Sequence, residues 1–398
     1  MMLIGLMAWH AIPAQSVSKT MKRLADTGQT HSYTTTFGQD ADYTIHPPVY
    51  NLNGNGTVTD TVTGLLWQQT DGGEMTIENA KLYCDTLSLG GFSNWRLPNC
   101  HELFSILNHD RANPAEDTIY FTKTAAEYWW SSQTQANDTT KIWVTNSGGG
   151  VGNHPKSETI SAGGPKRFHV RAVRDETHPP VLFTHFVNNG DGTSTDMLTN
   201  LTWQQTPSAD SMTWEQALST ADTLSYAGYH DWRVPNIKEI QSINDETLIN
   251  PSINQNSFSG IHTSHYWSST SLPNQPTKAW YLDTQFGITT YSNKTSSLPL
   301  LCVRGEYFHT GIGDCEASSS EILLYPNPSF DKLTVLFVGL DSTLYTIYIA
   351  DLQGRIVLAH QPLPHKTIDI SIFPKGVYIV NIIDKVGKSI GYKRFIKM

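Results

Sequence analysis

Apolar and polar positions follow one order twice along the chain, over residues 49–175 and again over residues 180–305. Each copy opens with Asn/Asp-Gly pairs, which are hairpin-turn signals, and reaches Trp67 or Trp203. Apolar residues at helical spacing follow, and strand-like runs close the copy. A self-similar order of this length indicates a tandem repeat. Two helices followed by an antiparallel sheet predict an α+β domain of about 125 residues in each copy.

The first helix of each copy has a Thr as its expected N-cap, Thr76 or Thr213. Gly90 and Gly228 are expected to end these helices. The predicted apolar faces consist of Ile77, Ala80, Cys84 and Leu87 in the first copy and of Trp214, Ala217, Ala221 and Leu224 in the second.

A second helix begins at a corner that reads GFSNWRLPNCHEL in the first copy and GYHDWRVPNIKEI in the second. The proline favours an extended residue before it. The Asn that follows is placed as an N-cap, and the Glu three residues later completes a capping box. We interpret this corner as structural. Its residues are Trp95, Arg96, Pro98, Asn99 and Glu102 in the first copy and Trp232, Arg233, Pro235, Asn236 and Glu239 in the second.

The remaining segments differ from the repeats. Residues 1–14 have a short apolar core before Ala14 and indicate a secretory signal, although a disordered or buried N-terminal segment is the alternative. Residues 15–48 are polar and are expected to form an extended leader, and residues 306–322 a linker. Alternating runs over residues 323–398 predict a small antiparallel β-sandwich of immunoglobulin-like type.

Charge narrows the classes of partner. The net charge is −9, with 10 Lys/Arg and 13 Asp/Glu in the first copy, 5 and 10 in the second, and 9 and 5 after residue 323. Acidic repeats argue against nucleic acid as the partner. No apolar run after the N-terminus approaches the ~20 residues that a transmembrane helix needs.

The repeats resemble the C-terminal domain family of bacterial collagen-like adhesins. The matching segments are GNGTVTD, WRLPNCHEL, YWWSS and VRAVRD in the first copy, and GDGTSTD, DWRVPNIKEI, YWSS and CVRG in the second. The resemblance implies two tandem C-type-lectin-like domains that are secreted or surface-bound; the adhesin members bind sulfated glycans. The repeats are also similar to sulfatase-modifying, formylglycine-generating domains.

The last 76 residues resemble a type IX secretion C-terminal sorting domain, through YPNPSFDKLTV, YIADLQGRIV, IFPKGVYIV and the basic end YKRFIKM. This resemblance implies export by the type IX machinery and removal of the domain. The mature protein is then expected to be secreted or held on the outer face of the outer membrane.

Motifs for catalysis are incomplete in this sequence. His101-Glu102 begins a zinc-binding HExxH motif, but Ser105 stands where the second His belongs. The Asn/Asp-Gly turns lack the bidentate Glu of a calcium loop, with Val62 and Leu198 at that place. The cysteine pair of the sulfatase-modifying domains is also incomplete, because Ala172 occupies one position. We therefore expect no catalytic residue, metal or cofactor.

Four cysteines occur, Cys84, Cys100, Cys302 and Cys315. Members of the resembled family commonly pair a Cys of the first helix with one of the last strand, but neither copy keeps both. Four cysteines allow three connectivities. The pairs Cys84–Cys100 and Cys302–Cys315 join the cysteines that are closest in sequence, and a Cys84–Cys302 bridge between the copies is the main alternative.

Several repeated large side chains are expected to be structural. The tryptophan pairs suit a hydrophobic core, and the arginines suit bonding to carbonyls or carboxylates. They are Trp67/Trp203, Trp95/Trp232, Trp130/Trp267, Trp143/Trp280, Arg96/Arg233 and Arg174/Arg304.

The sequence thus predicts a non-enzymatic adhesin-like protein that binds an extracellular glycan, while a structural protein–protein module and an enzyme on the sulfatase-modifying fold are the alternatives. Sulfated ligands need clustered cations, and the cations here are scattered, so a neutral or weakly charged glycan stacked on exposed Tyr or Trp fits better. The candidate ligand-binding residues are Lys156, Lys166, Arg167, Lys278, Tyr291, Asn293 and Lys294.

Overall fold

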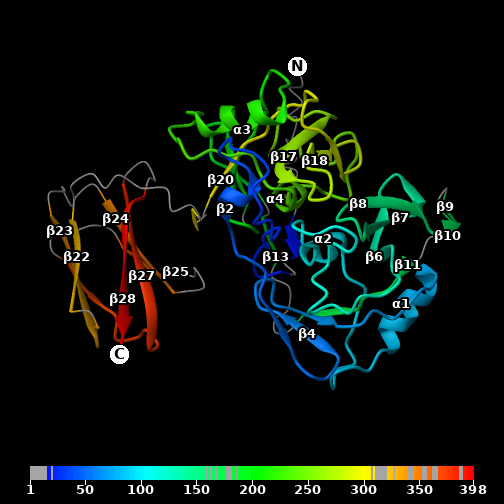
Figure 1. Cartoon of the computed structure of the whole chain (residues 1–398), viewed down its shortest axis with the longest axis horizontal. Helices are drawn as coiled ribbons and strands as arrows, with labels where there is room; N and C mark the ends of the chain where they lie inside the picture. The colour runs from blue at the N-terminus through cyan, green and yellow to red at the C-terminus, as the bar shows by residue number, and fades with distance from the viewer. Residues whose placement is uncertain are drawn as a thin grey trace, which may run out of the picture. The chain divides into compact units, whose positions relative to one another are not determined.

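A computed structural model describes residues 16–18, 21–157, 160–161, 164–165, 168–175, 182–184, 186–196, 198–305, 308–309, 321–326, 328–338, 345–351, 356–360, 366–384 and 389–398. The chain forms two compact units, one of residues 1–221 and 233–308 and the other of residues 222–232 and 309–398. Strands dominate and helices are few (Figure 1). No helix of the described residues is both long enough and apolar enough to cross a membrane.

Repeat one, residues 49–175, begins with an antiparallel sheet whose strand order is β12-β5-β4-β3. Two helices follow, and then strands that run into a larger sheet. The elements are β3 (Tyr50–Leu52), β4 (Thr57–Asp60), β5 (Leu65–Gln68), α1 (Ile77–Thr86), α2 (Cys100–Ser105), β6 (Tyr128–Gln135), β7 (Asp138–Asn146), β8 (Val151–Pro155), β9 (Ile160–Ser161), β10 (Gly164–Pro165), β11 (Phe168–His169) and β12 (Val173–Asp175).

Repeat two, residues 180–305, has the same order of elements, and its small sheet reads β14-β15-β16-β20. This agreement confirms the predicted helix-then-sheet arrangement in both copies. The elements are β13 (Leu182–Thr184), β14 (Phe186–Asn188), β15 (Thr193–Asp196), β16 (Thr202–Gln204), α3 (Trp214–Asp222), α4 (Ile237–Ser242), β17 (His265–Ser271), β18 (Lys278–Asp283), β19 (Ile288–Asn293) and β20 (Val303–Arg304); β21 (Phe308–His309) follows the repeat.

The helix starts agree with the sequence and the helix ends do not. Thr76 accepts a hydrogen bond from the Asn79 amide as the N-cap of α1, and both predicted capping boxes are present, at Asn99–Glu102 and Asn236–Glu239. The helices α1 and α3 end before the glycines that were expected to stop them. Gly90 and Gly228 lie instead in the short turns that follow, at positive φ, where a side chain would be strained.

The paired tryptophans are all buried, as the sequence predicts. Two of their indole hydrogen bonds also recur. Trp130 and Trp267 donate to the carbonyls of Met75 and Met212, just before the first helix. Trp95 donates to Leu89, and Trp232 donates to Tyr226 in the corresponding turn. Each copy therefore uses one indole to hold the residues before the first helix and another to hold the turn after it.

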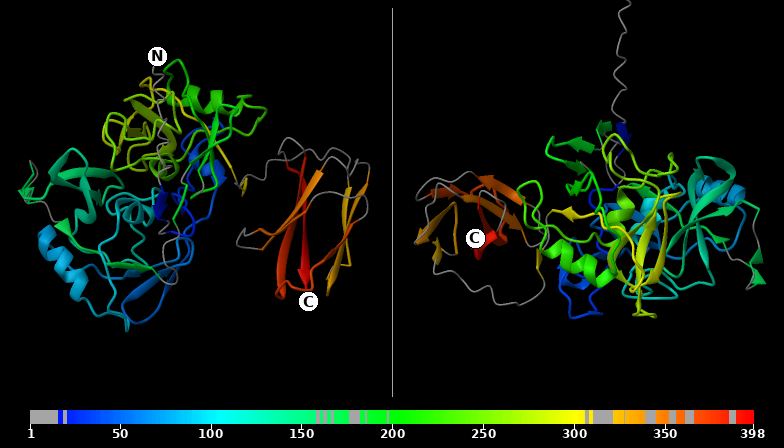
Figure 2. Two further views of the ribbon diagram at one scale, coloured as in Figure 1. Left: turned by 180° about the vertical axis from the view of Figure 1, so that it is seen from behind. Right: turned by 90° about the horizontal axis from the view of Figure 1, so that it is seen from above.

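The two repeats are joined by one sheet and share a hydrophobic cluster. Strand β8 of repeat one pairs with β19 of repeat two at Val151–Thr289, so a seven-stranded sheet runs β11-β6-β7-β8-β19-β18-β17. Phe104 and Leu107 of repeat one belong to the same hydrophobic cluster as Ile240 of repeat two. The cyan and teal part and the green and yellow part of the chain lie side by side in both views of Figure 2.

The glycine run at residues 148–150 packs closely against repeat two where the sheet crosses between the repeats. A Cβ on Gly150 would lie 3.1 Å from the Thr289 carbonyl oxygen and 3.4 Å from the Trp280 ring. A side chain at this position would therefore crowd the backbone of repeat two where the two strands pair, and glycine avoids this.

The leader is an ordered part of the same unit, although it was expected only to be extended. Its described elements are β1 (Ser16–Ser18), the short 3₁₀-helix η1 (Asp40–Asp42) and β2 (Tyr43–Thr44). The Gln29 amide donates to the carbonyls of His109 in repeat one and Ser271 in repeat two. The leader therefore bonds to both repeats at their junction.

A polar seam is buried where the leader, α2 and α4 meet. The Lys238 ammonium donates to the carbonyls of Asp26 and Ser105, both at 2.7 Å. His101, at the equivalent position of repeat one, pairs with Glu246 of repeat two at 2.9 Å. Burial lowers the pKa of Lys238 to about 8. Burial also raises the pKa of Asp26 to about 6, outweighing the backbone hydrogen bonds that its carboxylate accepts.

The C-terminal unit contains two antiparallel sheets, ordered β22-β23-β26 and β25-β24-β27-β28. Side chains of both sheets form one hydrophobic cluster, which includes Leu333, Ile347, Ile368 and Val380. The strands are β22 (Glu321–Tyr325), β23 (Lys332–Val338), β24 (Tyr345–Asp351), β25 (Ile356–His360), β26 (Lys366–Asp369), β27 (Gly376–Asp384) and β28 (Ser389–Lys397).

The expected disulfides involving Cys84, Cys100 and Cys302 are absent: all three are free, buried thiols. Cys84 lies on α1 in the core of repeat one, whereas Cys100 lies in the cluster that the repeats share. Short separation along the chain therefore does not bring these two side chains together. Cys315 lies outside the described residues.

The seam predicts a pH dependence that Asp26→Asn reduces; Asp40, whose pKa burial also raises, remains in this variant. A folded-state pKa raised from 3.8 to about 6 means that the stabilising contribution of Asp26 is complete below pH 3.8 and is lost as pH rises through about 6. Lys238 titrates above this window. We expect the free energy of unfolding of the wild type, relative to Asp26→Asn, to fall by on the order of 2 kcal/mol between about pH 4 and pH 7. Chemical denaturation of both proteins across this range measures the difference, and a constant difference would contradict the prediction.

Candidate functional site

The repeated corner presents an arginine to a buried carboxylate. In repeat two, Arg233 makes a bidentate pair with Glu239, with both distances 2.6 Å. In repeat one, Arg96 pairs with Glu102 at 2.8 and 2.7 Å. Each Glu also accepts the amide of its Asn N-cap. The corner is therefore held by its own residues, as the structural interpretation requires.

The surroundings of the two arginines differ. The Arg233 side chain is 2% exposed, and its guanidinium lies 5.3 Å from the ring of Tyr43 in the leader. The Arg96 side chain is 36% exposed and bonds additionally to Asp175 at 2.5 Å. The same corner is thus closed over in repeat two and partly open in repeat one.

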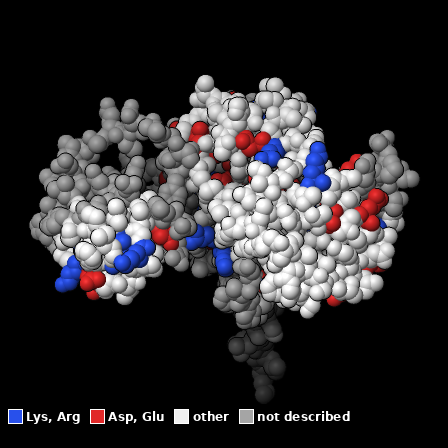
Figure 3. Space-filling model, turned by 60° about the horizontal axis from the view of Figure 1, so that its bottom comes forward, with Lys and Arg blue, Asp and Glu red and all other residues white. Residues whose placement is uncertain are grey.

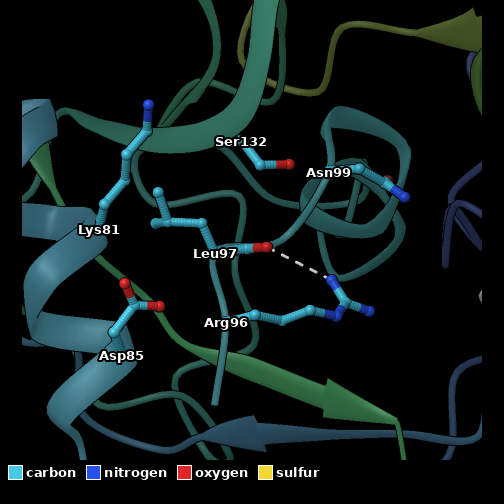
Figure 4. Close-up of a pocket in the computed structure, with 6 residues that line it drawn as sticks. All are labelled: Lys81, Asp85, Arg96, Leu97, Asn99 and Ser132. Carbon is cyan, nitrogen blue, oxygen red and sulfur yellow. Dashed lines mark hydrogen bonds between the residues drawn. The ribbon is translucent and has the colours of Figure 1, made fainter. Parts of the chain in front are cut away.

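An open groove of about 450 Å³ lies beside Arg96. Lys81 and Asp85 project into it from α1, and Asn99 and Ser132 lie opposite (Figure 4). Leu97, which is largely buried, also lines the groove, and its carbonyl accepts a hydrogen bond from Arg96. The groove offers an ammonium, a carboxylate, an amide and a hydroxyl, which suit binding of a polar ligand.

A second exposed patch contains two of the predicted ligand residues, Tyr291 and Asn293, on β19. The register of β18 and β19 sets Lys278 opposite Asn293 and Trp280 opposite Tyr291. The Tyr291 ring is 40% exposed, and the Lys278 ammonium lies 4.9 Å from its centre. Because side chains two residues apart share one face of a strand, Lys278, Tyr291 and Asn293 lie together.

The structure does not add the remaining candidates to this patch. The Lys294 ammonium is buried 3.8 Å from the Trp214 ring, and burial lowers its pKa to about 8. Lys156 follows β8, and antiparallel pairing at Val151–Thr289 places it on the opposite side of that pair from Asn293. Lys166 and Arg167 lie outside the described residues.

The sequence analysis missed the groove residues Lys81, Asp85 and Ser132. Lys81 and Asp85 are four residues apart and therefore share the exposed face of α1. A comparison of the two copies would have singled out Lys81, because its counterpart is Leu218. Arg96 and Asn99 were predicted only as structural residues, and both also line the groove.

The Lcl C-terminal domain model matches residues 56–174 and 192–304, which together make up more than half of the chain. The chain belongs to the Lcl C-terminal domain family. This confirms the resemblance seen in the sequence, and the groove and the patch are thus features of two Lcl C-terminal domains. The model for the secretion system C-terminal sorting domain matches residues 323–398 and indicates export by the type IX system.

Other comparisons add little to this assignment. A search of curated proteins finds no match. Among solved structures, the chain is similar to PorZ, an essential bacterial surface component of the type-IX secretion system of Porphyromonas gingivalis, with 14% identity and a TM-score of 0.17. The match covers 67% of this chain and 30% of the PorZ chain. A superposition of that quality supports no inference about fold or function.

The corner arginines of the Lcl domains are expected to stabilise the fold to different degrees. Removing one partner of a fully buried ion pair costs about 3–5 kcal/mol. The cost at Arg96 should be smaller, because its side chain is 36% exposed and water can reach the buried Glu102 carboxylate once the guanidinium is gone. Arg233→Ala should therefore lower the melting temperature more than Arg96→Ala, and Lys123→Ala, at an exposed residue, serves as the control. Thermal unfolding followed by circular dichroism measures this. Equal losses at both arginines would mean that burial does not govern their contribution.

Proposed function

We propose that this chain is a non-enzymatic binding protein, which type IX secretion delivers to the cell surface or the medium, and that it recognises an extracellular glycan of low charge. The observation that carries the ligand proposal is the patch of Lys278, Tyr291 and Asn293 on β18 and β19. The matching sorting domain supports the route of export.

The patch has the chemistry that a sugar requires. A tyrosine offers an apolar ring face with a hydroxyl at its edge, so the C–H face of a pyranose can stack on Tyr291. Asn293 can both donate and accept hydrogen bonds, and Lys278 donates only. The edge-on contact of Tyr291 with buried Trp280, at 5.6 Å, holds the platform in place.

Charge supports a neutral or weakly charged glycan over a sulfated one. Recognition of a sulfated chain draws on clustered Lys and Arg, and repeat two carries 5 of these against 10 acidic residues. The face seen in Figure 3 shows basic and acidic residues in small, separate groups with much uncharged surface between them. Lys278 alone contributes positive charge to the patch, and it lies on the Tyr291 ring.

A glycan array probed with the full chain tests this proposal. We expect binding to neutral or weakly charged glycans, a loss of about tenfold or more in Tyr291→Ala, and unchanged binding in Phe92→Ala, which alters an aromatic residue of similar exposure in repeat one. Binding should also persist in EDTA, because the Asn/Asp-Gly turns lack the bidentate Glu of a calcium loop. Binding that is confined to sulfated glycans, or that needs calcium, would contradict the proposal.

The sorting domain is proposed to be removed during export, so that the binding function resides before about residue 322. Exposed polar chain is the preferred site of proteolysis, and residues 306–322, with Ser318 to Ser320, have this composition.

Mass spectrometry of protein from the native cell surface or medium checks this removal. We expect abundant tryptic peptides from both repeats, none from residues 333–398, and a new C-terminus between about residues 308 and 325. Deletion of residues 375–398 should leave the protein in the periplasm. Peptides from residues 333–398 at the same abundance as those of the repeats would show that the domain is retained.

A further inference from the structure

The groove of repeat one has a filled counterpart in repeat two. The copies align without a gap from Thr76 and Thr213 to Trp143 and Trp280. Lys81, Arg96, Asn99 and Ser132 therefore correspond to Leu218, Arg233, Asn236 and Ser269. All four residues of repeat two are at most 4% exposed, whereas Lys81 and Ser132 are exposed and Asn99 and Arg96 are partly so.

The chain's own leader covers this place in repeat two. Gly38 lies against Leu218, since a Cβ on this glycine would be 3.6 Å from the Leu218 Cβ. Tyr43 lies over Arg233. The Thr34 hydroxyl donates to Glu215 on α3 at 2.9 Å. A stretch of ten residues therefore crosses the helix and the corner, and contacts them through a hydroxyl, a small residue and an aromatic ring.

Repeat one keeps the receiving positions, and among the described residues no segment equivalent to the leader covers them. Glu78, Lys81 and Arg96 stand where repeat two has Glu215, Leu218 and Arg233. One leader contact has no equivalent. Asp40 accepts from Thr270, and at the corresponding position Gln133 bonds to the Cys100 amide and to Glu246. The correspondence between the two repeats is therefore limited to Glu78, Lys81 and Arg96.

We propose that the repeat-one groove is a docking site for an extended peptide segment of another protein, held as the leader is held in repeat two. A Ser or Thr of the segment would meet Glu78, and an aromatic residue would lie over Arg96. The difference between Lys81 and Leu218 sets the specificity. In repeat two, Gly38 of the leader presents only backbone to Leu218. A bound segment with a carboxylate at the position equivalent to Gly38 would instead form an ion pair with Lys81. This site is distinct from the Tyr291 patch and does not depend on the glycan proposal.

Fluorescently labelled peptides based on residues 32–45 test the inference by anisotropy with the full chain. Gly38 has φ +107, a backbone conformation that a D-residue adopts without strain. The probe therefore carries D-Glu at this position, and D-Gln is the matched neutral control. We expect both peptides to bind the wild type saturably. The D-Glu peptide should bind about two- to fivefold more tightly than the D-Gln peptide, which is the contribution of an exposed ion pair.

Variants of the groove identify the place of binding. Lys81→Leu should abolish the difference between the two peptides, and Ser132→Trp should weaken both about tenfold or more by filling the groove. Lys81→Trp is a second blocking change on the exposed helix face, in case Ser132→Trp lowers the melting temperature. Lys123→Leu, outside the groove, and Tyr291→Ala, in the proposed glycan patch, should bind both peptides as the wild type does.

Three results would overturn the inference. The first is that neither peptide binds. The second is that both blocking variants bind the peptides as well as the wild type does, which would mean that the peptide binds elsewhere or exchanges with the leader. The third is that Ser132→Trp loses binding to a glycan of the array but keeps binding to the peptides. A failure of the glycan proposal would instead appear as array binding that Tyr291→Ala does not change.

Discussion

A buried ammonium makes the two Lcl domains and the leader dependent on one another. Lys238 lies on α4 of repeat two, but its acceptors are carbonyls of the leader and of α2 in repeat one. A buried charge without partners costs several kcal/mol, so repeat two is complete only when both neighbours are in place. His101 and Glu246 impose the same requirement from the other side of the junction. The shared sheet and core then follow from a junction that neither copy can satisfy alone.

This dependence also breaks the symmetry of the duplicated sequence. One leader serves two copies, and its contacts with Glu215, Leu218 and Arg233 use the surface of repeat two only. Repeat one compensates at its own arginine with Asp175, for which repeat two has Gly305. The copies have therefore diverged where the leader contacts one of them. Lys81 in place of Leu218 suits a surface that stays in water, whereas an apolar side chain suits one that is covered.

Local patterns predicted local structure well. Capping boxes, hairpin turns and buried tryptophans depend on residues close in sequence or on side chains too large to expose, and all of them are found where the sequence places them. The disulfides, the role of the leader and the groove could not be predicted in this way. Each depends on which surfaces meet in space. Cys84 and Cys100 are near in sequence but point into different cores. The polar leader gave no periodic signal, because its contacts are made by single side chains of different types, such as the Gln29 amide, the Thr34 hydroxyl and the Tyr43 ring.

The junction also changes what a duplicated binding domain can gain. Two domains on a flexible linker can adjust their spacing to a ligand, and avidity then depends on linker length. Here one sheet joins the repeats, so the β19 patch and the α1 groove belong to one compact unit. Their separation is therefore set by the fold, and a partner that offers both a glycan and a peptide must match it. Such a fixed pair loses adaptability, but it avoids the conformational entropy that a flexible linker would lose on binding both at once. The glycines at residues 148–150, which allow the sheet to continue across the junction, thus determine how the two proposed sites can be used together.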